Sequence, residues 1–197
     1  KFPEPFDTEK LPDKMQSFSN FKIDFNGNFF DLIHPKISHD FLLGMFLSIF
    51  KKKKWDQNLN IIDLENLKDD LKFSNIDNTG PHIKIFSKAF STSSVFFYSK
   101  PLTVNLHGIR EWGDYYPLVE SVWIPEIVEI HRKNGLSFFK YLICKNSSVK
   151  KLFINLFRIY FIKKYKGAEH LNFYSHFFKN LLFPSVYFFP IYRLFQI

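Results

Sequence analysis

Residues 146–167 read NSSVKKLFINLFRIYFIKKYKG, and this stretch decides how the C-terminal third of the chain folds. Ser147 or Ser148 can cap the N-terminus of a helix, because a serine side chain accepts hydrogen bonds from the first free backbone N–H groups. Gly167 is a residue type that commonly ends a helix. We therefore predict a helix that begins after these serines and runs through Lys166.

This predicted helix is unusually apolar. Lys151, Asn155 and Arg158 form a narrow polar strip, and apolar side chains cover most of the remaining circumference. Such a helix needs apolar partners on several sides. The candidate partners are the protein's own sheet, a larger assembly or a membrane interface. Residues 159–162 are β-branched or aromatic, so a strand at this position is an alternative to the helix.

Residues 159–169 read IYFIKKYKGAE. This segment resembles the strand and Gly-Ala-Glu signature in the C-terminal domain of the KH-containing small-subunit ribosomal protein family, where a basic residue stands three positions before the glycine, as Lys164 does here. Asn172 stands in place of the family's next arginine. The resemblance implies a ribosomal RNA-binding role for a divergent or split relative that lacks the family's first domain. It also implies a strand over residues 159–166.

Charge is distributed unevenly along the chain. Residues 1–130 carry 15 Lys or Arg against 18 Asp or Glu, which gives −3, whereas residues 131–197 carry 12 Lys or Arg and only Glu169, which gives +11. A concentrated positive field favours polyanions, either nucleic-acid phosphates or the anionic face of a membrane. The chain has 23 Lys and 4 Arg, and specific phosphate and base recognition usually draws on Arg, so a solvated lysine surface is the alternative interpretation.

Size and apolar content are those of a globular protein, with 197 residues of which 46% are apolar and 23% charged. The longest uncharged apolar runs, residues 41–50 and 181–192, are shorter than the roughly 18–20 residues that cross a bilayer, so we expect no transmembrane helix. The single cysteine, Cys144, excludes an internal disulfide and a thiolate zinc site, which favours a reducing compartment.

The composition indicates an AT-rich genome. Phe, Ile, Lys, Asn and Tyr have AT-rich codons and are abundant, whereas the chain has only two alanines, Ala89 and Ala168, although alanine is the best helix former. Such mutational bias is common in organelle genomes and in AT-rich protists, so we expect a mitochondrial protein of the matrix or of the matrix face of the inner membrane. Residues 1–14 contain no Arg-rich amphipathic targeting peptide.

The N-terminal two thirds of the chain have the pattern of a β-rich region. Residues 1–14 contain three prolines, as in an extended arm. Residues 21–33 alternate apolar and polar side chains around Asn26-Gly27, which predicts a β-hairpin with a type I′ turn. Further strands are predicted at residues 82–90, 94–98 and 102–109.

Capping residues and helical spacing predict three more helices. The first runs from Ser38 and places Lys51–Lys54 at its C-terminal end, where cations suit the helix dipole. The second is a short acidic helix over Asp63–Lys72. The third has about ten residues, begins near Pro125 and stops before Gly135.

The remaining segments complete an α+β fold class. Residues 74–81 are predicted to form a polar loop, and residues 181–197 an extended tail that packs into a neighbour. We predict a mixed or antiparallel sheet with short helices over residues 15–123. This region is continuous with a basic, aromatic and mainly helical region over residues 124–197.

Motifs of catalytic chemistry are missing from the sequence: it has no Gly-rich phosphate loop, no His-Glu-x-x-His and no Gly-x-Ser-x-Gly. The best polar cluster, His107, Arg110, Glu111 and Asp114, follows a predicted strand, and a structural loop is the commoner use of such a cluster. The seven histidines lack the i, i+4 spacing of metal ligands on a helix. Cys144 ends an apolar run, as an inert buried thiol does. We therefore expect no enzymatic activity, cofactor or metal.

These observations favour a structural component of a mitochondrial ribosome, which binds rRNA and neighbouring ribosomal proteins and takes no small-molecule substrate. The candidate RNA-binding residues are Lys51, Lys52, Lys53, Lys54, Arg132, Lys133, Lys150, Lys151, Arg158, Lys163, Lys164 and Lys166. The alternative is a peripheral accessory subunit of an inner-membrane respiratory complex. In that case the apolar, Lys-flanked helix near residues 152–162 lies at the interface and its lysines contact anionic lipid.

Overall fold

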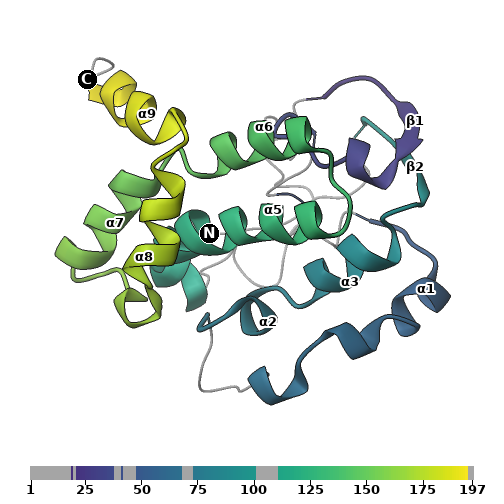
Figure 1. Ribbon diagram of the computed structural model, residues 1–197, viewed down its shortest axis with the longest axis horizontal. Coiled ribbons are helices and arrows are strands. Elements are labelled where there is room, and N and C mark those ends of the chain that lie inside the picture. The colour runs from purple at the N-terminus through teal and green to yellow at the C-terminus, as the bar shows by residue number, and fades with distance from the viewer. Residues whose placement is uncertain are drawn as a thin grey trace, which may run out of the picture.

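The computed structural model describes residues 19, 21–37, 41, 48–67, 73–100 and 111–194, and the structural statements below refer to these residues. The described chain is mostly helical and has one small antiparallel sheet, as an α+β fold class predicts (Figure 1). Its elements are β1 (Phe25–Asn28), α1 (Lys52–Asp56), α2 (Ile76–Thr79), α3 (His82–Ala89), β2 (Ser94–Phe97), α4 (Tyr116–Leu118), α5 (Ile124–Lys133), α6 (Phe138–Ser148), α7 (Leu152–Phe161), α8 (Phe173–His176) and α9 (Ser185–Leu194).

Helix α5 forms the centre of the fold, with α6 and α3 packed beside it (Figure 1). Its sequence signals agree with its bounds: Pro125 and Glu126 lie in the first turn, and the last turn is basic. Gly135 follows with φ +116°, a conformation that favours glycine. The helix predicted here is confirmed. A π-helical turn, Val119–Trp123, joins it to α4.

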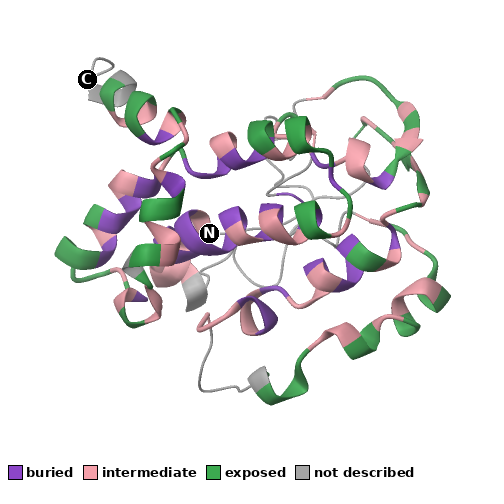
Figure 2. Cartoon of the chain, viewed as in Figure 1, coloured by how far each residue is buried: buried purple, intermediate pink, exposed green. Residues whose placement is uncertain are grey.

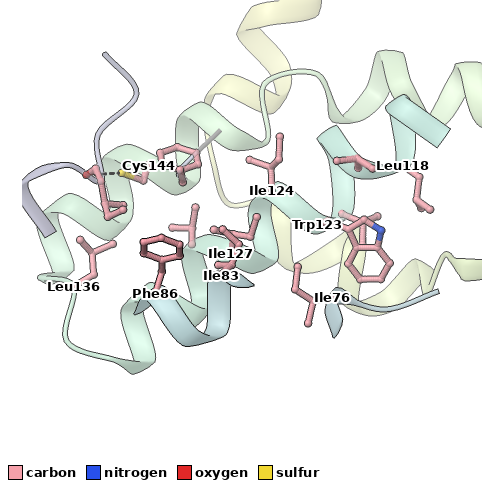
Figure 3. Close-up of a cluster of buried hydrophobic side chains, with 14 of the residues drawn as sticks. Ile76, Ile83, Phe86, Leu118, Trp123, Ile124, Ile127, Leu136 and Cys144 are labelled. Carbon is pink, nitrogen blue, oxygen red and sulfur yellow. Dashed lines mark hydrogen bonds between the residues drawn. The ribbon is translucent and has the colours of Figure 1, made fainter. Parts of the chain in front are cut away.

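The main hydrophobic core surrounds α5. Ile83 and Phe86 of α3 pack against Ile127 of α5, and Cys144 enters from α6 (Figure 3). The same core includes Phe29 near the N-terminus and side chains as late as α7, so the acidic and the basic parts of the chain share it. Figure 2 shows that the outer faces of the surrounding helices are exposed.

A second, smaller core holds the C-terminal helices together. Val149, Leu152 and Leu156 are buried against Val186 of α9. The tail predicted to be extended is therefore helical over Ser185–Leu194, and that prediction is wrong. The helix forms because it has a local apolar partner.

The predicted hairpin at Asn26-Gly27 is also wrong. Both residues lie inside β1, which pairs with β2 so that Asn26 faces Phe96 across the sheet. The ring of Phe25 stacks on that of Phe97 with centroids 5.4 Å apart. This contact and the ladder around it favour a long-range strand pair over a local turn. The strand predicted at residues 94–98 is confirmed as β2.

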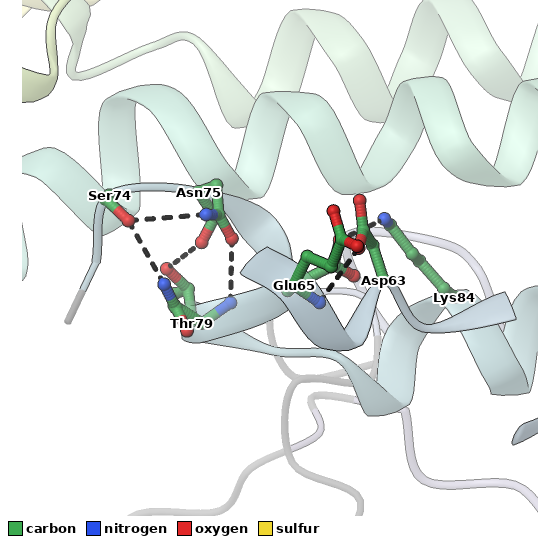
Figure 4. Close-up of polar contacts among 8 residues, drawn as sticks. Asp63, Glu65, Ser74, Asn75, Thr79 and Lys84 are labelled. Atoms are coloured by element: carbon green, nitrogen blue, oxygen red, sulfur yellow. Dashed lines mark hydrogen bonds and ion pairs between the residues drawn. The ribbon is translucent and has the colours of Figure 1, made fainter. Parts of the chain in front are cut away.

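The strand predicted at residues 82–90 is a helix, α3. Ile83, Phe86 and Phe90 are buried, and their spacing of three and four residues places them on one helical face toward the core. Residues 74–81, predicted as a loop, contain the short helix α2. Its N-cap Asn75 accepts a hydrogen bond from the backbone N–H of Asn78 at 2.9 Å (Figure 4).

The helix predicted to run through Lys166 is interrupted and shorter. Ser147 and Ser148 end α6 instead of capping a new helix, and α7 stops at Phe161. A strand is not formed either, because residues 159–161 belong to α7. The strand alternative at residues 159–162 is therefore wrong, and so is the strand over residues 159–166 that the family resemblance implies.

Several predictions lie outside the described residues. These are the arm at residues 1–14, the strand at residues 102–109, most of the helix from Ser38 and the end of the helix through Lys72. Of the latter, the start is described: Asp63 caps a 3-10 turn over Leu64–Asn66. Within the described chain, none of the helices has the length and apolar character needed to span a membrane.

Candidate nucleic-acid interface

A surface cavity of about 460 Å³ lies where α7 and the turn after it meet residues 113–120. The chain closes this arrangement with a hydrogen bond from the backbone N–H of Lys166 to the backbone carbonyl of Asp114, 3.0 Å long. Gly167 then turns the backbone with φ +104° against Leu118. The cavity is lined by Gly113, Asp114, Tyr116, Pro117, Glu120, Lys151, Arg158, Lys164 and Tyr165. We call it the α7 pocket.

One wall of the α7 pocket is a connected polar network. The Lys151 Nζ lies 2.7 Å from Glu120 Oε1, and Asn155 Nδ2 donates to Glu120 Oε2 at 3.1 Å. The Arg158 Nη1 donates to Asn155 Oδ1 at 3.2 Å. Because Asn155 is fully buried, its amide holds both partners in fixed places. The network therefore positions Arg158 at the pocket wall.

Exposed lysines lie directly before and after α7 in the chain. Lys163, Lys164 and Lys166 are exposed, and in the described part of the chain none of them forms an ion pair. Lys150 is exposed on the turn before α7 and its Nζ lies 6.0 Å from the ring centroid of Phe189. Of the predicted RNA-binding residues, the structure brings together Lys151, Arg158 and Lys164 at the pocket, whereas Lys150, Lys163 and Lys166 lie on the exposed segments directly before and after α7.

Exposed aromatic side chains lie on α7, just before Lys163 in the chain. Phe157 and Phe161 on α7 stack with ring centroids 5.1 Å apart, and 73% of Phe161 is exposed. Tyr160 is half-exposed on the same helix. Cations and exposed aromatic rings on one surface are what single-stranded nucleic acids bind, through phosphates and stacked bases.

The other predicted RNA-binding residues lie elsewhere. Arg132 and Lys133 are exposed at the end of α5 that leads into α6, where Arg132 Nη1 donates to the carbonyl of Leu136 at 2.9 Å. Lys51–Lys54 are at α1, at the opposite end of the long axis from α7 (Figure 1).

The position of Lys51–Lys54 corrects a prediction. They begin α1 and do not end a helix, so the argument from the helix dipole fails. The Lys52 Nζ instead pairs with Asp56 at 2.6 Å, one turn along α1. The Lys54 Nζ donates to Ser93 Oγ at 2.6 Å and serves the packing of α1 on the core.

The polar cluster considered for catalysis is only partly described. His107 and Arg110 lie outside the described residues, and of Glu111 only the backbone is described. Asp114 lines the α7 pocket. Among the described residues, no group of three or more His, Cys, Asp or Glu side chains is placed to hold a metal ion. Cys144 is buried as predicted, and burial raises the pKa of its thiol to about 12.

Sequence reasoning missed two charged groups with buried surroundings. The Lys145 Nζ lies 2.7 Å from Glu129 Oε1 and donates to the carbonyl of Pro125 at 3.1 Å. Burial lowers the pKa of Lys145, although Glu129 opposes this shift. Lys84 pairs with the buried Asp77 at 2.6 Å, next to the polar contacts that cap α2 (Figure 4). Neither pair has a signal in the sequence, because its members come together only in the folded chain.

Comparison with known proteins gives no match: no protein-family model, no curated protein and no solved structure is similar to this chain. The fold and the site therefore define the protein by class alone. It is a mainly helical α+β protein with a pocket beside α7 that cations and two tyrosines line.

Proposed function

We propose that the protein is a structural component of a mitochondrial ribosome and binds rRNA through the surface around α7. The observation that carries this proposal is the group of exposed lysines Lys163, Lys164 and Lys166, which directly follow the exposed stacked rings of Phe157 and Phe161 in the chain. Lysines neutralise phosphates, and exposed rings provide platforms for unstacked bases. The basic composition of residues 131–197 and the abundance of amino acids that have AT-rich codons support the same assignment.

The proposal assigns a positioning role to the protein. Each lysine that contacts a phosphate displaces a counterion, so affinity falls with salt by a slope of about 0.7 to 0.9 per contact on logarithmic axes. Such contacts carry no base specificity by themselves. The protein would therefore fix the path of an rRNA segment, and the aromatic side chains would hold bases that leave the helical stack.

Charge reversal tests the proposal. We expect the double variant Lys163→Glu/Lys166→Glu to lose co-sedimentation with the ribosomal particle and to lower the salt slope of RNA binding by about 1.4 to 1.8. The matched control is Lys22→Glu/Lys88→Glu, which makes the same change of net charge at exposed positions that are not among the candidate RNA-binding residues. Equal binding by both double variants would contradict an RNA surface at α7.

A second candidate function is a peripheral accessory subunit of an inner-membrane respiratory complex. Large apolar side chains are strongly exposed on the C-terminal helices and turns: Leu182 is 87% and Phe188 69% exposed. A leucine offers no ring on which a base can stack, whereas aliphatic side chains flanked by lysines suit the boundary of an anionic bilayer. Lysine, which greatly outnumbers arginine, also suits lipid headgroups.

Gradient fractionation separates the two functions. Detergent-solubilised mitochondria are fractionated with and without nuclease, and the chain is followed by mass spectrometry beside rRNA and respiratory subunits. We expect co-migration with rRNA that nuclease abolishes. Nuclease-insensitive co-migration with a respiratory complex would replace the ribosomal proposal with the membrane-associated one.

A further inference from the structure

The α7 pocket has the size of a small-molecule site. Its volume of about 460 Å³ lies within the range of about 300–1,000 Å³ that such sites occupy. The polar network leaves Arg158 ready for a ligand, because its guanidinium uses one N–H for Asn155 and has four others. Lys164 provides a second cation at the same pocket.

The charges that line the pocket leave a small positive excess. Lys151 and Glu120 neutralise each other across 2.7 Å, which leaves Arg158 and Lys164 against Asp114. Two cations beside one carboxylate can bind a phosphate, and a planar guanidinium binds it through two parallel hydrogen bonds. The Asp114 carboxylate is an acceptor for hydroxyl groups, such as those of a ribose.

The pocket also offers a stacking surface. The Arg158 guanidinium carbon lies 6.0 Å from the ring centroid of Tyr165, and both residues line the cavity together with Tyr116. RNA-binding proteins stack unpaired bases on aromatic rings and on guanidinium planes. Phosphate donors, a hydroxyl acceptor and stacking groups therefore meet in one cavity.

We propose that the α7 pocket binds a single extruded nucleotide, whose phosphate contacts Arg158 and Lys164 and whose base lies against Tyr165. This inference rests on the proposed RNA-binding function and deepens it, because it adds a specific pocket to a surface of exposed lysines. Neither Lys163 nor Lys166 lines the pocket, so pocket and surface are tested by different variants.

The experiment titrates the chain with AMP, with inorganic phosphate and with a single-stranded RNA oligonucleotide, and calorimetry measures the binding in each titration. We expect AMP to bind and to compete with the oligonucleotide, and inorganic phosphate to bind about tenfold more weakly because it lacks a base. Tyr165→Leu and Arg158→Lys should each weaken AMP binding about tenfold. Phe139→Leu is the matched control and should leave AMP binding unchanged, because Phe139 is an exposed ring on α6 that belongs neither to the pocket nor to the α7 surface.

Each outcome decides one of the two proposals. If Lys163→Glu/Lys166→Glu weakens RNA binding but AMP neither binds nor competes, the pocket assignment is overturned and the RNA surface stands. If the chain binds AMP but does not bind RNA, the pocket assignment stands and the proposed RNA-binding function is overturned. Two further results would overturn the nucleotide assignment. One is that inorganic phosphate binds as tightly as AMP. The other is that AMP does not bind but anionic vesicles do, in a way that depends on Arg158. Arg158→Lys keeps the test valid if Tyr165→Leu fails to fold.

Discussion

Protonation of His131 should limit the stability of this protein at low pH. The imidazole is fully buried, with Nδ1 3.0 Å from Ser87 Oγ and Nε2 3.3 Å from the carbonyl oxygen of Phe41. A carbonyl only accepts, so Nε2 carries the proton in the neutral ring and Nδ1 accepts from the serine hydroxyl. Burial without a carboxylate partner lowers the pKa of His131 from 6.5 to about 4.

The direction and size of the effect follow from this pKa. Because the folded pKa is depressed, the unfolded chain binds the proton more readily, so stability is full above pH 6.5 and is lost as the pH falls toward 4. At pH 5 the unfolded histidine is almost fully protonated and the folded one about one tenth protonated. The linkage relation then gives a loss of about 2 kcal/mol between pH 8 and pH 5, and about 3 kcal/mol at pH 4.

Urea unfolding followed by tryptophan fluorescence at pH 8 and pH 5 measures this loss. The comparison is with His131→Gln, whose amide keeps a donor and an acceptor but does not titrate. Burial also lowers the pKa of His34 and of His176, and both residues remain in the variant, so the difference between the two proteins isolates His131. We expect the loss to be about 2 kcal/mol smaller in the variant. An equal loss in both proteins, or an NMR titration of His131 with a pKa near 6.5, would refute the reasoning.

Two further predictions test the packing. Gly167→Ala should lower the free energy of unfolding, measured by chemical denaturation, by about 2 to 5 kcal/mol, because φ is +104° and the new Cβ would lie 2.8 Å from Leu118 Cδ2. The control Gly113→Ala, which has open space around it, should change the free energy of unfolding by no more than about 0.5 kcal/mol. Equal losses in the two variants would contradict this reasoning. Cys144 should react with iodoacetamide at pH 8 about a thousandfold more slowly in the native protein than in the protein unfolded by guanidinium, as measured by mass spectrometry. The reason is that burial raises the pKa of the thiol from 9.0 to about 12 and reduces the thiolate fraction in proportion. Comparable rates in the two states would show that the thiol is accessible.

Local signals predicted the fold where tertiary contacts agree with them. In α5, a proline and an acid in the first turn, bases in the last turn and a glycine after it all indicate the same bounds. At Asn26-Gly27 the local turn does not form. The pairing of Phe25 with Phe97, on a strand about 70 residues away, stabilises the chain more than a local turn would. Such pairing is invisible to a window of neighbouring residues.

The end of α6 and the start of α7 also depend on contacts with residues that are distant in the sequence. The sequence offers Ser147 and Ser148 as N-caps, so a helix was predicted to begin after these serines, whereas they end α6 and α7 begins at Leu152. In the fold, Val149 and Leu152 are buried against α9, and the chain turns between them to bring both side chains into the second core. The identity of α9 as a partner, and therefore the break, depends on residues about 35 positions away.

The candidate site was predicted as a set of cations, and the fold divides that set. Lys151 is neutralised by Glu120, and Lys51–Lys54 lie far from α7. Lys163 and Lys166 were recognisable from the sequence because a run of lysines after an apolar helix has to face water. Asp114 belongs to the polar cluster that the sequence indicated, but its position in one pocket with Tyr165 depends on the backbone hydrogen bond from Lys166.

The charge asymmetry of the sequence is partly resolved within the fold. Lys140, Lys145 and Lys151, from the basic part of the chain, pair with Asp31, Glu129 and Glu120, from the acidic part. Among the described residues, three of the twelve cations of residues 131–197 thus pair with acids of residues 1–130, so the net charge of +11 overstates the unpaired charge of this part. These pairs join the acidic and the basic parts of the chain at the edges of the core. Within the described part of the chain, the exposed lysines after α7 form no such pair, and their positive charge suits the anionic partner that we propose.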